Sequence, residues 1–126
     1  MIERIFPATE DQLEPVQSFI NGELEQYDCP PKAQIQLAVA VEEIFINIVR
    51  YAYHPEVGLA TVRCSVGGDP LQVTIQFLDN GDADITRSAE ERDIGGLGIL
   101  MVKKSMDAVD YEYVDGKNIL TIRKNL

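Results

Sequence analysis

The stretch that decides the fold is Val41-Glu-Glu-Ile-Phe-Ile-Asn-Ile-Val-Arg-Tyr-Ala-Tyr53. It is apolar almost throughout, and its apolar residues recur at the spacing of a helix. At about 100° per residue, one stripe of this helix forms a core face, made of Leu37, Val41, Ile44, Phe45, Ile48 and Ala52. Glu43 and Asn47 form a second stripe, because residues at this spacing lie one turn apart on the same face. A polar pair on an apolar helix lowers stability unless it has partners, so this pair requires an explanation.

Glu43 and Asn47 have two explanations. Glu43 can act as a general base, and the amide oxygen of Asn47 suits a hard cation such as Mg²⁺. Alternatively, both residues form the solvated polar edge of an amphipathic helix. Glu42 lies on the opposite flank of the core stripe and therefore does not share their site.

The rest of the chain predicts further helices and strands. The expected helices run from a cap at Thr9 to about Tyr27, from a cap at Asp28 or Cys29 to about Tyr53, and from Ile99 to about Met106. The expected strands are Glu3–Ala8, Ala60–Val66, Leu71–Leu78, Ala108–Val114 and Asn118–Lys124. Asp115-Gly116 is a strong hairpin signal between the last two strands. This order predicts an α+β fold, a two-layer α/β sandwich whose mostly antiparallel, mixed sheet carries about three helices on one face.

Composition and charge limit the classes of function. The chain has 126 residues, and we expect a single domain over residues 1–126. Its formal net charge of −10 argues against direct binding to nucleic acid and against docking on an anionic membrane. It has no secretory signal and no apolar run of the ~20 residues that a membrane span requires, so we expect a cytoplasmic protein. Cys29 and Cys64 lack metal-ligand spacing and are expected to be free, buried thiols.

A second candidate site follows the central strand, at Asp79-Asn80-Gly81. By the alternation of the strand, Asp79 points to the same face as the apolar residues, the face that should meet the helices. A carboxylate there can accept a hydrogen bond from an exocyclic amine, as on adenine, and Gly81 would let a flat base approach the backbone. A plain Asp-Asn-Gly turn is the alternative.

A third candidate is the glycine-rich entry to a helix, Gly95-Gly-Leu-Gly98. Free backbone amides at a helix N-terminus bind phosphate, and glycines allow close approach. The sequence has neither a Walker A lysine pattern nor the strand that precedes a dinucleotide-binding glycine motif. The polar segment from Asp79 to Ile94 reads as a long loop, and Arg92 in it could reach a phosphate if the loop closes. A flexible glycine-rich loop with surface arginines is the alternative.

The order of these motifs is more specific than any one of them. A helix with Glu-x-x-x-Asn, a strand ending in Asp-x-Gly, a loop, and a Gly-x-Gly that opens a helix together resemble the GHKL ATPase superfamily. That group includes sensor histidine kinases, type II topoisomerases and a heat-shock chaperone. Within it, the chain most resembles the small bacterial anti-sigma factors that are also serine-protein kinases. The resemblance covers essentially the whole chain and implies one histidine-kinase-like ATPase domain with a Bergerat-type sandwich.

The resemblance implies roles for the site residues. Glu43 matches the catalytic base that activates a protein serine hydroxyl, and Asn47 matches the ligand of a Mg²⁺ ion that bridges the ATP phosphates. Asp79 matches the residue that reads adenine, with Gly81 beneath the base. The other positions of the implied nucleotide site are Arg50, Tyr51, Arg92, Gly95, Gly96, Leu97, Gly98 and Asn118.

Three departures from the family pattern concern the loop and the phosphates. Asp82-Ala-Asp-Ile85 follows Gly81 where relatives often have a proline or glycine with a phenylalanine. Tyr51 stands where relatives often carry histidine, so contacts near the phosphates are expected to differ. The loop is acidic, which should raise the cost of holding a triphosphate without Mg²⁺, and Arg92 would offset part of this.

The resemblance implies an ATP- and Mg²⁺-dependent serine-protein kinase that acts as an anti-sigma, partner-switching regulator of transcription. The expected partners are a sigma factor and an anti-anti-sigma protein that the kinase phosphorylates on serine, and a homodimer is expected. Two alternatives stay open. One is a non-catalytic nucleotide-binding module that docks proteins. The other is the catalytic fragment of a sensor histidine kinase, which is disfavoured because the first helix contains no histidine.

Overall fold

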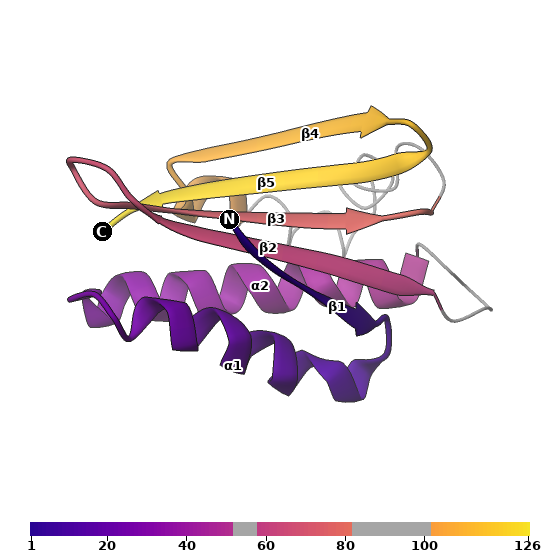
Figure 1. Cartoon of the computed structure of the whole chain (residues 1–126), viewed down its shortest axis with the longest axis horizontal. Coiled ribbons are helices and arrows are strands. Elements are labelled where there is room, and N and C mark those ends of the chain that lie inside the picture. The colour runs from indigo at the N-terminus through magenta and orange to yellow at the C-terminus, as the bar shows by residue number, and fades with distance from the viewer. Residues whose placement is uncertain (52–57, 82–101) are drawn as a thin grey trace.

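The computed structural model describes residues 1–51, 58–81 and 102–126. Its elements in chain order are β1 (Ile2–Pro7), the 3-10 turn η1 (Glu10–Gln12), α1 (Leu13–Leu24), α2 (Pro31–Tyr51), β2 (Leu59–Gly67), β3 (Gln72–Asp79), β4 (Ala108–Val114) and β5 (Lys117–Asn125). Residues 102–105 are helical as well. Helices α1 and α2 lie side by side against one face of a five-stranded sheet (Figure 1). The predicted two-layer α+β sandwich is confirmed.

The sheet has the strand order β1-β2-β3-β5-β4, with β1 and β4 at its edges. We expected a mixed sheet with mostly antiparallel pairs, whereas all neighbouring pairs of the described strands are antiparallel. Short turns connect β2 to β3 and β4 to β5, and such turns join antiparallel strands. The predicted hairpin at Asp115 and Gly116 is confirmed, because both residues have positive φ angles, 52° and 76°, as a tight two-residue hairpin requires.

Helix α2 supplies the centre of the core. Val41 and Phe45 have no exposed surface, and the core stripe of α2 that is buried with them comprises Leu37, Ile44 and Ile48. This stripe packs against the apolar residues of β3, which alternate with half-buried polar residues along the strand. Fully burying one such side chain stabilises the fold by about 1.5–3 kcal/mol. The predicted core stripe is therefore confirmed as far as Ile48, and Ala52 lies outside the described residues.

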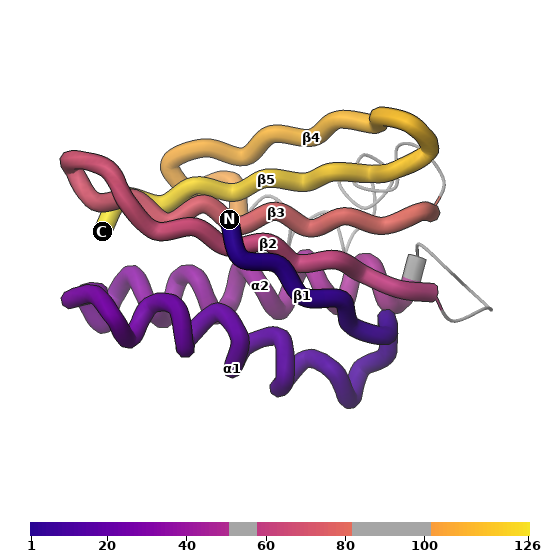
Figure 2. Tube along the Cα trace, in the orientation of Figure 1, coloured from indigo at the N-terminus to yellow at the C-terminus, as the bar shows by residue number. Residues whose placement is uncertain are grey.

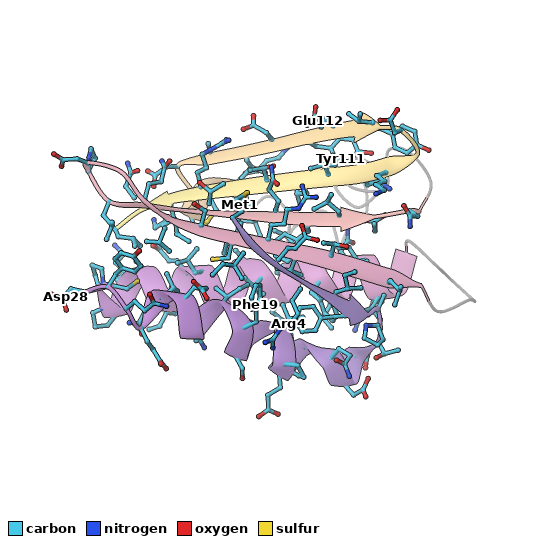
Figure 3. The ribbon with its side chains drawn as sticks, viewed as in Figure 1. Met1, Arg4, Phe19, Asp28, Tyr111 and Glu112 are labelled. Carbon is cyan, nitrogen blue, oxygen red and sulfur yellow. The ribbon has the colours of Figure 1, made fainter. Side chains whose placement is uncertain are left out.

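Aromatic contacts join α1 to the edge strand β1. The ring centroids of Phe6 and Phe19 are 6.1 Å apart. The guanidinium carbon of Arg4 lies 5.4 Å from the centroid of the Phe19 ring, within the range of a cation–π contact. Figure 3 shows Arg4 and Phe19 next to each other between β1 and α1. These contacts anchor the first helix to the outer part of the sheet.

The first helix differs from its predicted bounds at both ends. The chain turns helical at Glu10, but as a 3-10 turn, and the Thr9 hydroxyl donates a hydrogen bond to the Asp11 carboxylate instead of capping a backbone amide. Helix α1 ends at Leu24, its last buried residue, and not near Tyr27. Of the helices in residues 1–51, 58–81 and 102–126, none has both the length and the apolar character needed to cross a membrane.

Candidate functional site

Asp79 is a buried carboxylate at the C-terminal end of β3. Only 5% of its surface is exposed, and it shares the helix-facing side of the strand with the apolar residues, as predicted. The backbone N–H of Gly81 donates a hydrogen bond to Asp79 Oδ1 at 2.9 Å. The side-chain amide of Asn118 donates another to the same oxygen, also at 2.9 Å. Within residues 1–51, 58–81 and 102–126, the hydrogen-bond partners of this carboxylate are neutral donors, and burying a carboxylate against neutral donors costs stability, which is typical of a functional position.

Asn118 connects β5 to the turn that follows β3. It lies directly opposite Asp79 in the register of the two strands and is 2% exposed. Its Nδ2 also donates a hydrogen bond to the carbonyl oxygen of Gly81 at 3.2 Å. Tyr111 of β4 donates its hydroxyl hydrogen to Asn118 Oδ1. One network therefore joins β3, β5 and β4 at this end of the sheet, and we call its four members, Asp79, Gly81, Tyr111 and Asn118, the Asp79 network.

Burial determines the electrostatics of Asp79. Loss of hydration raises the pKa of the carboxyl above its ordinary value, and the hydrogen bonds from Asn118 and Gly81 lower it in part. Both of these hydrogen bonds end on Oδ1. Among the described residues, neither of these donors engages Oδ2, so Oδ2 is the oxygen that could accept a hydrogen bond from a ligand, and a nitrogen donor suits such a site.

Glu43 and Asn47 lie one turn apart on α2, and both side chains are half-buried. Glu42 is exposed, as the predicted helix phase requires. Arg50 is exposed, and its Nε lies 3.9 Å from Oε1 of Glu10. The half-burial of Glu43 and Asn47 fits a polar pair at the border of the core, where a ligand can still reach both.

The structure brings together three of the predicted site residues. Asp79, Gly81 and Asn118 are in hydrogen-bond contact. Figure 2 shows the C-terminal half of α2, the end of β3 and the beginning of β5 at the same end of the molecule. Glu43 and Asn47 belong to this C-terminal half of α2.

The glycine-rich segment lies outside the described residues. This holds for Arg92, Gly95, Gly96, Leu97 and Gly98 and for the acidic loop before them. Tyr51 is the last described residue of α2, and its side chain also lies outside the described part. The phosphate contacts expected of these residues stay predictions.

Sequence reasoning missed Tyr111. Tyr111 and Tyr113 both lie in the predicted strand Ala108–Val114, and the alternation of a strand places them on one face. In the register, Tyr113 lies directly opposite Asn118, whereas Tyr111 lies opposite Leu120. The hydroxyl of Tyr111 nevertheless reaches Asn118 along the diagonal of the strand pair. No local pattern in the sequence distinguishes the two tyrosines.

The Asn47 side chain on α2 fits a magnesium ion that is shared with a phosphate ligand. Its amide oxygen is a hard donor, and Mg²⁺ takes one or two such protein ligands and completes its shell with water and phosphate oxygens. Among the described residues, no three His, Cys, Asp or Glu side chains gather into a group that could hold a metal ion. The donor set is thus too sparse for an all-protein metal site within that part of the chain.

The two cysteines are free and buried, as predicted. Burial, with a smaller contribution from the charge of Glu23, raises the pKa of the Cys64 thiol to about 11. Burial also raises the pKa of Cys29. Both thiols are therefore protonated at neutral pH and are poor nucleophiles.

These features define a class of protein, the two-layer sandwiches that resemble the catalytic domains of histidine kinases. The model of the histidine kinase-like ATPase domain family matches residues 6–124, and the chain belongs to this family. Among solved structures, the SiaB–SiaC complex from Pseudomonas aeruginosa contains a chain that is 18% identical, with a TM-score of 0.63 and coverage of 100% of this chain and 90% of that chain. A blue-light activated histidine kinase of Erythrobacter litoralis EL346 is 14% identical, with a TM-score of 0.62 and coverage of 92% and 60%. At these identities, the likeness concerns the fold.

Curated relatives are closer in sequence. An anti-sigma F factor of Thermoanaerobacter sp. (strain X514) is 28% identical over 95 residues, which cover 67% of this chain and 64% of the relative. The serine-protein kinase RsbW of Listeria monocytogenes is 31% identical over 98 residues, which cover 67% of this chain and 61% of the relative. The chain thus spans slightly less than two thirds of the length of these relatives.

Proposed function

We propose that this chain is an ATP- and Mg²⁺-dependent serine-protein kinase that also acts as an anti-sigma regulator in partner switching. The observation that carries the proposal is the buried Asp79 carboxylate, held by Asn118 and Gly81, in a member of the histidine kinase-like ATPase family. The similarity to an anti-sigma F factor supports the anti-sigma role, and the similarity to a serine-protein kinase supports the kinase activity.

Asp79 would recognise the base of the nucleotide. Its Oδ2 can accept a hydrogen bond from the exocyclic amine of adenine, whereas guanine presents a carbonyl oxygen at the same position of the ring. The hydrogen bonds to Oδ1 from Gly81 and Asn118 hold the carboxylate ready without help from the ligand. Gly81 would let the base lie close to the backbone, because it has no side chain.

Glu43 and Asn47 would act at the phosphate end. Phosphoryl transfer is catalysed mostly by positioning and by neutralisation of charge. Asn47 would hold Mg²⁺, which neutralises phosphate charge when bound. Glu43 would accept the proton of the attacking serine hydroxyl, and its half-burial leaves it reachable by that hydroxyl. The glycines at 95, 96 and 98 would offer backbone amides to the phosphates.

The partners in this proposal are a sigma factor and a small protein that is phosphorylated on serine and relieves the inhibition. We further propose that the kinase is a homodimer and works in the cytoplasm. The formal net charge of −10 suits protein partners with basic surfaces and opposes direct contact with DNA.

The test of the proposed chemistry is a phosphoryl-transfer assay. The purified protein is incubated with radiolabelled ATP, Mg²⁺ and an extract of the native cell, and labelled proteins are treated with acid and identified by mass spectrometry. Phosphoserine survives acid, whereas phosphohistidine does not. We expect one small protein to carry acid-stable label.

Glu43→Gln should abolish this transfer while ATP still binds, because it removes the base and leaves the Asp79 network intact. Glu42→Gln is the matched control, since Glu42 is the neighbouring, exposed glutamate. Transfer by Glu43→Gln at the wild-type rate would contradict the mechanism. ATP binding without label on any protein would favour a non-catalytic module, and acid-labile label would favour a histidine kinase.

A further inference from the structure

We propose that Tyr111 is a positioning residue for base recognition: its hydroxyl orients the Asn118 amide, which in turn aims Asp79 Oδ2 at the exocyclic amine of adenine. This inference rests on the proposed nucleotide site and adds a residue from the edge strand β4 to it. Tyr111 does not itself contact the base in this account.

The orientation of the Asn118 side chain depends on its hydrogen-bond partners. An asparagine amide has an acceptor oxygen and a donor nitrogen that are nearly equal in shape, so only its hydrogen-bond partners determine which points where. Asn118 Nδ2 donates to Asp79 Oδ1 at 2.9 Å and to Gly81 O at 3.2 Å. If the amide were reversed, its oxygen would face two other acceptors, which is repulsive.

Tyr111 supports the productive orientation from the other side. Asn118 Oδ1 can only accept a hydrogen bond, so the Tyr111 hydroxyl must be the donor. Without this donor, the buried Asn118 oxygen loses the hydrogen bond from Tyr111, and the amide is held less firmly in its orientation toward Asp79. The hydrogen bond from Asn118 would then orient the Asp79 carboxylate less well.

The placement of Tyr111 makes it suitable for this task. Its ring is half-buried and packs against the core, which limits the motion of the hydroxyl. Tyr111 lies at the β4–β5 side of the sheet (Figure 3), and its hydroxyl reaches Asn118 of β5. Tyr113, two residues further along the same face, is 47% exposed. Tyr113 is therefore a matched control of the same residue type on the same strand.

The test measures base discrimination by Tyr111→Phe. The dissociation constants of ATP and of purine riboside triphosphate, which lacks the exocyclic amine, are measured with Mg²⁺ for the wild type, Tyr111→Phe and Tyr113→Phe. The ring of Tyr111 is retained, so the variant should fold, and circular dichroism checks this. We expect Tyr111→Phe to lower the preference for ATP by about three- to tenfold. This ratio of dissociation constants corresponds to the net free energy of one ordinary hydrogen bond.

A purely structural role for Tyr111 would weaken both nucleotides equally and would overturn the inference, as would an unchanged preference. The control Tyr113→Phe should keep the wild-type preference for ATP. If it loses as much of this preference as Tyr111→Phe does, the inference is also overturned. In the background of Asp79→Asn, Tyr111→Phe should change the preference no further, because the two residues act through one contact. If the wild-type protein binds neither nucleotide, the proposed function itself is contradicted. If the wild type prefers ATP and Tyr111→Phe keeps that preference, only the role of Tyr111 is contradicted.

Discussion

Asp79 and Asn118 face each other across β3 and β5, and Asn118 Nδ2 lies 2.9 Å from Asp79 Oδ1. The contact joins two residues that are 39 positions apart in the chain, and it exists only in this register of the two strands. A slip by one residue would turn Asn118 to the open face of the sheet and leave Asp79 without its side-chain donor. The strand pairing that builds the core therefore also builds the candidate site.

Asp79→Asn should make the protein more stable at neutral pH. Burial raises the pKa of Asp79 in the folded state above its ordinary value of 3.8, so stability is lost as the pH rises from 3.8 to the folded pKa, and the loss is complete above the folded pKa. Asparagine removes this charge, and its side-chain oxygen can accept the same two hydrogen bonds. The measurement is urea unfolding of both proteins at pH 7 and at decreasing pH.

The advantage of Asp79→Asn should shrink as the pH falls through the folded pKa, and it should be smallest below 3.8, where the wild-type carboxyl is protonated in both states. A variant that is clearly less stable than the wild type at pH 7 would contradict the electrostatic account of this site.

Phe45→Ala should cost about 3–5 kcal/mol of unfolding free energy, because it leaves a cavity in the core. Phe45 has no exposed surface and belongs to the core stripe of α2. Ile35→Ala, on the same helix, removes a side chain that is 67% exposed, and its effect should stay within about 0.5 kcal/mol. Equal losses from the two variants in urea unfolding would show that the core stripe of α2 is assigned to the wrong face.

Cys64 should resist thiol reagents in the folded protein. Its pKa of about 11 leaves roughly one thiol in a thousand ionised at pH 8, and only 1% of its surface is exposed. In Cys29→Ser, which isolates Cys64, labelling by a disulfide reagent should be slow in buffer and complete in urea. The rate should rise as the pH approaches 11. Rapid labelling at pH 8 would mean that the core opens around β2.

Arg50→Ala should change the unfolding free energy by less than about 1 kcal/mol, as expected for an exposed ion pair. The pair with Glu10 is long, 3.9 Å, and both side chains are more than half exposed. If Arg50 also contacts nucleotide phosphate, Arg50→Ala weakens ATP binding and Glu10→Ala does not. Unchanged affinity in Arg50→Ala would remove Arg50 from the nucleotide site.

The helix and strand pattern could be predicted because buried residues recur at the helical spacing in α2 and at every second residue in β3. The spacing of the apolar residues in α2 predicted its core face, and the alternation in β3 predicted that Asp79 points to the helix layer. The Asp115-Gly116 hairpin was equally predictable, since few residues adopt two consecutive positive φ angles. The end of α1 was not, because exposed residues after Leu24 carry no signal that separates a helical turn from a loop.

The candidate site was predictable only in part. Asp79, Gly81 and Asn118 were expected near a nucleotide, the first two from local chemistry and Asn118 from family resemblance alone. The hydrogen bonds among them depend on the β3–β5 register, which no local pattern encodes. Tyr111 depends further on a diagonal contact across β5. The contacts within the site thus depend on long-range strand pairing, which residue type and local spacing do not reveal.

The most direct test of the account is a calorimetric titration of the wild type and Asp79→Asn with ATP in the presence of Mg²⁺. The account predicts one ATP per wild-type chain and an affinity at least about tenfold lower in Asp79→Asn, since a hydrogen bond to a charged group contributes about 1.5–3 kcal/mol. Equal affinities in the two proteins, or no binding by the folded wild type, would contradict it.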